Sequence, residues 1–164
     1  MIRRIMLYVC AAVLGIMCAA ASSCAFTTAE VAGNGMEPAI SSGSRVLINK
    51  LAYRKSGAVP ETGNLIAFYS DVYSEEGEGR ILVRRVAGAS GDTVEIKDDI
   101  FYLNGSPYTE FMSEAAHMDD LEKITLGDDE IFVLSDNRKS AMDSRNEAIG
   151  ILAVQDCIGK VCFE

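Results

Sequence analysis

The sequence is poor in the residues that hold metal ions and in the basic residues that bind nucleic acids. It contains a single histidine, His117, and its five cysteines include no pair at CxxC spacing. This pattern argues against a zinc site, and we expect neither a metal nor another cofactor. Lys and Arg total 15 against 24 Asp and Glu, a formal net charge of −9. Such a surface repels a phosphate backbone, so we expect no nucleic-acid partner.

The cysteines do not predict a disulfide framework. Cys10, Cys18 and Cys24 lie within or at the edge of an N-terminal hydrophobic stretch. Cys157 and Cys162 are five positions apart in an expected strand, where they would face opposite sides and could not bridge without a break. We therefore predict that these last two are buried, small apolar side chains.

Charge is absent from a long stretch near the N-terminus. No charged residue occurs between Arg4 and Glu30, a distance longer than the roughly 20 residues that cross a bilayer as a helix. We predict a cytoplasmic stub at residues 1–4 and a transmembrane signal anchor at residues 5–26, with Arg3 and Arg4 inside. The protein would then be a single-pass protein of the cell membrane, with residues 27–164 extracytoplasmic.

Two other interpretations of this stretch remain open. Small residues at positions 19–21 and 23–25 would suit removal as a signal peptide. Alternatively, residues 21–23 lead into Cys24 as in a lipoprotein signal, although a larger apolar residue is usual where Ala21 stands.

The remainder of the chain predicts one mainly β domain. Residues 27–35 are expected to approach the domain without regular structure, and residues 109–123 to form a variable insertion, either a short helix or a loop. Asn104 and Gly105 tolerate the positive φ of a tight hairpin turn. Short apolar runs separated by Gly and Pro indicate an antiparallel sheet fold. The expected strands are 45–50, 64–69, 81–87, 93–96, 100–103, 106–108 and 131–134, and residues 149–154 and 158–163 are expected to add one or two more.

Three motifs in this domain occur in a specific order. Residues 31–38 read Val-Ala-Gly-Asn-Gly-Met-Glu-Pro. Residues 82–92 read Leu-Val-Arg-Arg-Val-Ala-Gly-Ala-Ser-Gly-Asp. Residues 135–145 read Ser-Asp-Asn-Arg-Lys-Ser-Ala-Met-Asp-Ser-Arg. They resemble the patterns V-x-G-x-S-M-x-P, L-V-K-R-V-x-G-x-x-G-D and G-D-N-R-x-x-S-x-D-S-R of type I signal peptidases, the S26 serine peptidases that remove signal peptides outside the membrane. The resemblance implies a signal-peptidase-like antiparallel β-sheet domain.

Both residues of the family's catalytic dyad are replaced. The nucleophilic serine of the family corresponds to Gly35, and the general-base lysine corresponds to Arg84. A serine–lysine dyad needs a hydroxyl that attacks and a neutral lysine that accepts its proton. Glycine has no hydroxyl, and arginine stays protonated in proteins. We therefore expect no intact catalytic site, and no other residue that substitutes for the dyad; His117 is expected to be a solvated surface residue.

The supporting residues of the family are nevertheless present. The resemblance implies that Ser140 orients the base, and that Asp143 and Arg145 form a supporting salt bridge. It also implies a peptide-binding cleft, in which Gly33 lets a bound peptide approach the backbone closely. The residues expected to form this cleft are Gly33, Asn34, Gly35, Met36, Val83 and Arg84.

Three functional hypotheses follow from these residues. In the first, the protein binds an extended segment of a pilin or another secreted protein, as the resemblance to non-catalytic signal-peptidase-like proteins encoded with Gram-positive sortase-built pili implies. Its role would then be to assist pilus assembly at the membrane surface. In the second, it is an active or variant signal peptidase I. In the third, it is an anchored structural domain without a peptide ligand. The missing nucleophile and base favour the first hypothesis.

Overall fold

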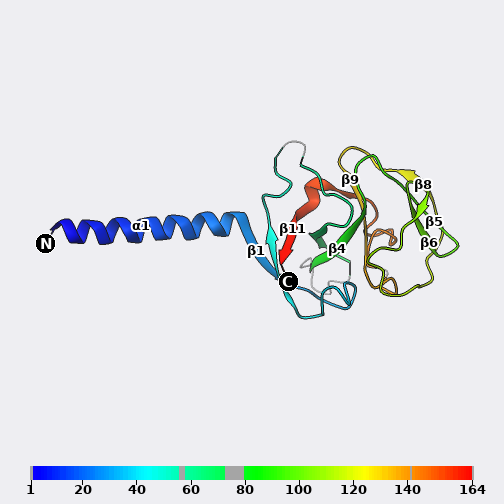
Figure 1. Cartoon of the computed structure of the whole chain (residues 1–164), viewed down its shortest axis with the longest axis horizontal. Helices are drawn as coiled ribbons and strands as arrows, with labels where there is room; N and C mark the ends of the chain where they lie inside the picture. The colour runs from blue at the N-terminus through cyan, green and yellow to red at the C-terminus, as the bar shows by residue number, and fades with distance from the viewer. Residues whose placement is uncertain (1, 56–57, 73–79, 141, 164) are drawn as a thin grey trace.

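A single N-terminal helix leads into a domain of β-strands. The structure is a computed structural model that describes residues 2–55, 58–72, 80–140 and 142–163. Helix α1 (Ile2–Ala25) projects away from the strands, and the two sheets follow one another along the long axis of the molecule (Figure 1). The expected mainly β, antiparallel architecture is therefore confirmed.

The predicted anchor at residues 5–26 is helical up to Ala25. Within the described residues, however, we find no helix with the length and apolar character needed to cross a membrane. This finding does not support the predicted transmembrane span of residues 5–26.

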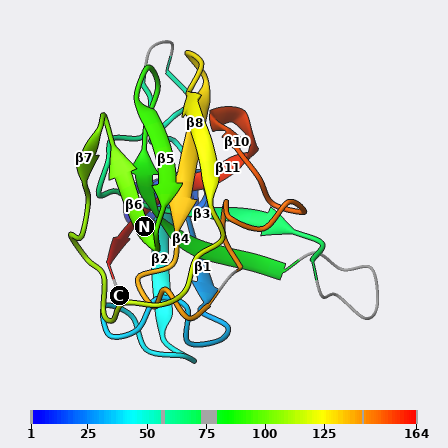
Figure 2. The same ribbon diagram turned by 90° about the vertical axis from the view of Figure 1, so that its right-hand side faces the viewer.

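The strands of the described residues form two antiparallel sheets. In the first, the spatial order is β1 (Phe26–Glu30), β2 (Arg45–Asn49), β11 (Cys157–Phe163), β3 (Leu65–Ser70), β4 (Arg80–Gly88), β9 (Glu130–Leu134) and β10 (Leu152–Ala153). In the second, it is β7 (Ser106–Pro107), β6 (Ile100–Leu103), β5 (Thr93–Lys97) and β8 (Leu121–Thr125). A short 3-10 helix at Val154–Asp156 precedes β11. The second sheet lies in front when the molecule is viewed from that end (Figure 2).

Apolar side chains from both sheets form the core. One cluster, which includes Met36 and Val83, lies between the segment after β1 and strands β2, β3 and β4. A second, centred on Phe101 and Phe132, joins the two sheets, and the two rings stack with centroids 5.6 Å apart. These contacts hold β4 between its neighbours, and β4 is the strand that carries Arg84.

The expected hairpin is confirmed at the turn between β6 and β7. Asn104 and Gly105 have φ values of 52° and 79°, and Leu103 pairs with Ser106 across the turn. Positive φ at both central positions gives the turn a twist that matches the flanking strands.

Two segments differ from the expectation. Residues 26–30 form strand β1, paired with β2, instead of an irregular approach. Residues 109–123 contain no helix among the described residues, and β8 begins within them at Leu121. Leu121 and Ile124 are three positions apart, a spacing that places two residues on one face of a helix but on opposite faces of a regular strand. A register shift of β8 against β5 lets both side chains pack on the same core cluster.

The two C-terminal cysteines also differ from each other. Cys157 is half-buried, and burial raises the pKa of its thiol to about 12. Cys162 is exposed, so the prediction that both are buried is wrong for Cys162. Strand β11 is irregular in this region, with one register shift between Cys157 and Gly159 and another between Val161 and Phe163, so simple alternation does not place the two cysteines.

Candidate functional site

Strand β4 and the loop after β1 bring together Gly35 and Arg84, the two positions at which the motif resemblance predicts the dyad. Arg84 lies in β4 opposite Ile66 of β3. Gly35 lies in the loop that follows β1, and its carbonyl accepts a hydrogen bond from the Asn137 amide at 2.9 Å. Asn137 also donates from its side chain to the Asn34 carbonyl at 3.3 Å. The motif at residues 135–145 thus holds the loop of the 31–38 motif beside strand β4, which carries the 82–92 motif.

Arg84 is a buried cation held by backbone carbonyls. Its residue is 3% exposed. Its Nε donates to the Met142 carbonyl at 2.6 Å, and its Nη1 donates to the Val83 carbonyl at 2.6 Å. Burial lowers the pKa of Arg84, while nearby Asp143 raises it. Because arginine starts from so high a pKa, the side chain stays protonated and can donate but cannot accept a proton.

Gly35 makes room for this guanidinium. A Cβ at position 35 would lie 3.1 Å from Nη2 and 3.2 Å from Cζ of Arg84, and 3.2 Å from Oγ of Ser140. These distances are tighter than ordinary van der Waals contact, so a larger residue at position 35 requires one of these groups to move. The guanidinium of Arg84 therefore packs closely beside the point where a side chain at position 35 would begin.

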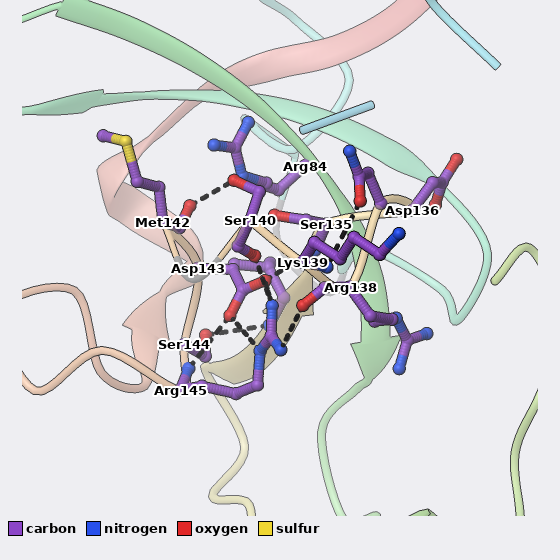
Figure 3. A network of polar contacts seen from close by, with 12 residues as sticks. Arg84, Ser135, Asp136, Arg138, Lys139, Ser140, Met142, Asp143, Ser144 and Arg145 are labelled. Carbon is purple, nitrogen blue, oxygen red and sulfur yellow. Dashed lines mark hydrogen bonds and ion pairs between the residues drawn. The ribbon is translucent and has the colours of Figure 1, made fainter. Parts of the chain in front are cut away.

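A buried polar network supports Ser140 from the side away from Arg84. Asp143 is fully buried and accepts bonds from the Ser135 amide at 2.8 Å and from Nε and Nη2 of Arg145 at 2.8 and 2.7 Å. Arg145 Nη2 also donates to the Ser140 carbonyl. Arg84, Ser140 and Met142 lie together on one side of this network (Figure 3). The Asp143–Arg145 salt bridge implied by the motif is present at 2.7 Å.

Arg85, which follows Arg84 in the strand, faces the other way. It forms a two-point ion pair with Asp136 at 2.8 and 2.6 Å, and its guanidinium lies 4.0 Å from the centre of the Phe111 ring. Successive strand residues point to opposite faces. The two adjacent arginines thus serve different parts of the protein, and only Arg84 reaches Gly35.

A groove with a cavity volume of about 170 Å³ opens above Gly35 and Arg84. Gly33, Asn34 and Ser140 also line it. Gly33 has a φ of 77°, which favours glycine, and no atom lies within 4 Å of where its Cβ would stand.

Two residues that we expected in the cleft do not line it. Met36 and Val83 are 0% and 2% exposed, and their side chains belong to the core. Val83 points away because it alternates with Arg84 along β4. His117 is also absent from the groove; its side chain is 82% exposed and contacts Asp99 at 2.7 Å, as a surface residue.

Sequence reasoning missed several groove residues. Arg80 and Leu82 share the face of β4 that carries Arg84, so period-two alternation could have identified them. No sequence pattern distinguishes the others, which come from separate loops. The residues missed are Ala32, Val72, Arg80, Leu82 and Met142.

Comparisons with known proteins identify the family of the chain. A family model described as "Signal peptidase, peptidase S26" matches residues 1–164. Signal peptidase IB of Staphylococcus aureus is 30% identical over 155 residues, which cover 84% of this chain and 76% of the relative. Signal peptidase I of Bacillus amyloliquefaciens is 30% identical over 148 residues, covering 84% and 75%.

Among solved structures, a signal peptidase I from Enterococcus faecalis is similar with a TM-score of 0.49 and 25% identity, covering 63% of this chain and 97% of that one. The family match over the whole chain and the two relatives suffice for the assignment: the chain belongs to the signal peptidase S26 family.

Proposed function

We propose that this chain is a catalytically inactive member of the family, which binds an extended segment of a pilin or another secreted protein and assists pilus assembly at the membrane surface. The observation that carries the proposal is the pairing of Gly35 with Arg84. Position 35 offers no hydroxyl to attack a peptide carbonyl. The guanidinium beside it is held protonated by two carbonyl acceptors and cannot act as a base.

The binding part of the proposal is supported by an open strand edge beside the groove. Residues Arg80 to Arg84 pair with β3 on one side. On the other side, pairing with β9 begins only at Arg85, so this part of β4 has no strand partner there among the described residues. An extended peptide can add to such an edge through main-chain hydrogen bonds while its side chains enter the groove.

The alternative is an active signal peptidase I. The names of the relatives favour it, since both are called signal peptidases. It requires a nucleophile and a base other than the residues at positions 35 and 84. Of the described groove residues, Ser140 is the one with a hydroxyl, and Arg80 and Arg84 are the titratable ones; neither arginine can accept a proton from Ser140.

The full-length chain in detergent micelles is expected to bind a signal-peptide substrate without cleaving it. Product formation would be followed by mass spectrometry, with signal peptidase IB of S. aureus as the active control, and binding by fluorescence anisotropy of the labelled peptide. Turnover above buffer that disappears in Arg84→Ala would overturn the proposal and favour the enzyme. Absence of both turnover and binding would favour a structural domain without a peptide ligand.

We expect the N-terminal helix to be retained and to attach the protein to the membrane. The large apolar side chains between Ile5 and Met17 are each at least half exposed on α1, and such a surface is stable only against an apolar partner. The full chain should remain in the membrane pellet after alkaline carbonate extraction, and its intact mass should include residue 1. A lipid-modified N-terminus at Cys24, or a start after residue 21 or 25, would contradict retention.

A further inference from the structure

We propose that the groove recognises a carboxylate on the extended peptide and that Arg84, with Ser140, binds it. This inference rests on the proposed function, because it concerns the ligand of the same groove. It assigns to Arg84 a role that the family's lysine does not have, as a fixed receptor for a negative charge.

The first reason is that Arg84 lacks a counter-ion. Its side-chain partners among the described residues are two neutral carbonyls. The buried carboxylates nearby are already paired, Asp143 with Arg145 and Asp136 with Arg85. Buried charges are normally paired, since an unpaired charge in a low-dielectric site is costly. A ligand carboxylate would provide the missing partner.

The second reason is the direction of the remaining donors. The carbonyls of Val83 and Met142 occupy Nη1 and Nε of Arg84, and within the described part of the chain Nη2 has no hydrogen-bond partner. Oγ of Ser140 likewise has no hydrogen-bond partner within the described part of the chain. Nη2 of Arg84 and Oγ of Ser140 lie 3.1 and 3.2 Å from the point where a Cβ on Gly35 would stand, so the two groups converge on that point. Two convergent donors, one of them charged, suit the two lone-pair-rich oxygens of a carboxylate.

The third reason is the local charge of the groove. Arg80 and Arg84 line it, and its described lining residues include no Asp or Glu, although the chain as a whole carries a net charge of −9. The remaining side chains of the lining are largely apolar, among them Val72, Leu82 and Met142. An apolar surround lowers the effective dielectric and strengthens a charge–charge contact.

The carboxylate can come from either of two sources, the C-terminus of a peptide or an internal Asp or Glu side chain. Three labelled octapeptides of alanine and serine distinguish them. One has a free C-terminal carboxylate, the second a C-terminal amide, and the third an amide with a central glutamate. Affinities would be measured by fluorescence anisotropy with the full-length chain in detergent micelles.

We expect at least one of the two charged peptides to bind about tenfold or more tightly than the neutral amide, the ratio that a charge-assisted hydrogen bond supports. Arg84→Met should remove this preference. Arg84→Lys should retain only part of it, because a single ammonium cannot present the fork of a guanidinium. Ser140→Ala should reduce the preference less than Arg84→Met, and Arg45→Gln, an exposed arginine outside the groove, should leave it unchanged.

The outcomes separate this inference from the function on which it rests. Equal binding of the neutral and both charged peptides would overturn the carboxylate assignment and leave peptide binding intact. Failure of all three peptides to bind would contradict both the carboxylate assignment and the proposed peptide binding. A preference that persists in Arg84→Met but disappears in Arg80→Gln would move the binding site from Arg84 to Arg80 and overturn the role given to Arg84.

Discussion

The double variant Gly35→Ser, Arg84→Lys is expected to cleave a signal-peptide substrate slowly, whereas neither single variant does. Only the double change provides both a hydroxyl and a base that can lose its proton. Proton transfer to a positioned base contributes about 10²- to 10⁴-fold, so turnover should exceed that of either single variant by at least about 100-fold. Such non-additivity is typical of residues that act as a unit.

The packing at this position adds a further reason for the expected pattern. In Gly35→Ser alone, the new Cβ would lie 3.1 Å from the fixed guanidinium of Arg84, so the serine would be crowded and faced with a permanent cation. Replacing arginine by lysine removes two of the three atoms that cause this crowding, Nη2 and Cζ, and leaves Oγ of Ser140 at 3.2 Å. Because position 84 is 3% exposed, burial should also lower the pKa of the introduced lysine and favour the neutral form that a base requires.

A matched control tests the nucleophile separately. The double variant Gly35→Ala, Arg84→Lys differs from Gly35→Ser, Arg84→Lys only by the hydroxyl at position 35, and it should be inactive. Turnover would be measured by mass spectrometry of the released products, and thermal unfolding would confirm that each variant is folded. Equal activity in Gly35→Ser alone, or in the alanine control, would show that another base or nucleophile is at work and would refute the mechanism.

Asp143→Asn is expected to lower the free energy of unfolding by about 3 kcal/mol or more, the usual cost of removing one partner of a buried ion pair. Asp143 is fully buried, and the side chain of Arg145 is 8% exposed. The amide would leave the Arg145 guanidinium without its counter-charge. In either orientation, its NH₂ group would replace an oxygen that now accepts a hydrogen bond from the Ser135 amide or from Arg145. Chemical denaturation followed by circular dichroism measures the change.

The exposed Asp128→Asn provides the matched control, because the side chain lies in solvent; its effect should stay within about 0.5 kcal/mol. The double variant Asp143→Asn, Arg145→Gln should lose less than the sum of the two single losses, because it leaves no unpaired charge. Additive losses, or a change in Asp143→Asn no larger than in the control, would show that the pair does not stabilise the site.

Much of the fold could be predicted from sequence because its determinants are local. Strand alternation and turn chemistry identified β2, β3, β5, β6 and β9 closely, and the positive φ of Asn104 and Gly105 follows from the turn itself. Strand β8 could not be predicted in this way. Its apolar residues Leu121 and Ile124 share a face only through the register shift against β5, and a register shift is a property of the pair of strands.

By itself, the sequence determined the family and the antiparallel β architecture. It also predicts the loss of both dyad groups, since a missing hydroxyl and a permanent cation are properties of the residue types at positions 35 and 84. Only the tertiary structure decided how those residues are used. It placed the guanidinium of Arg84 against Gly35, so that the two residues pack closely. It also turned Met36 and Val83 into the core and brought Arg80 and Met142 to the groove. The physical reason is that packing and hydrogen-bond direction depend on neighbours that are distant in the chain, here the 135–145 motif and the carbonyl of Met142.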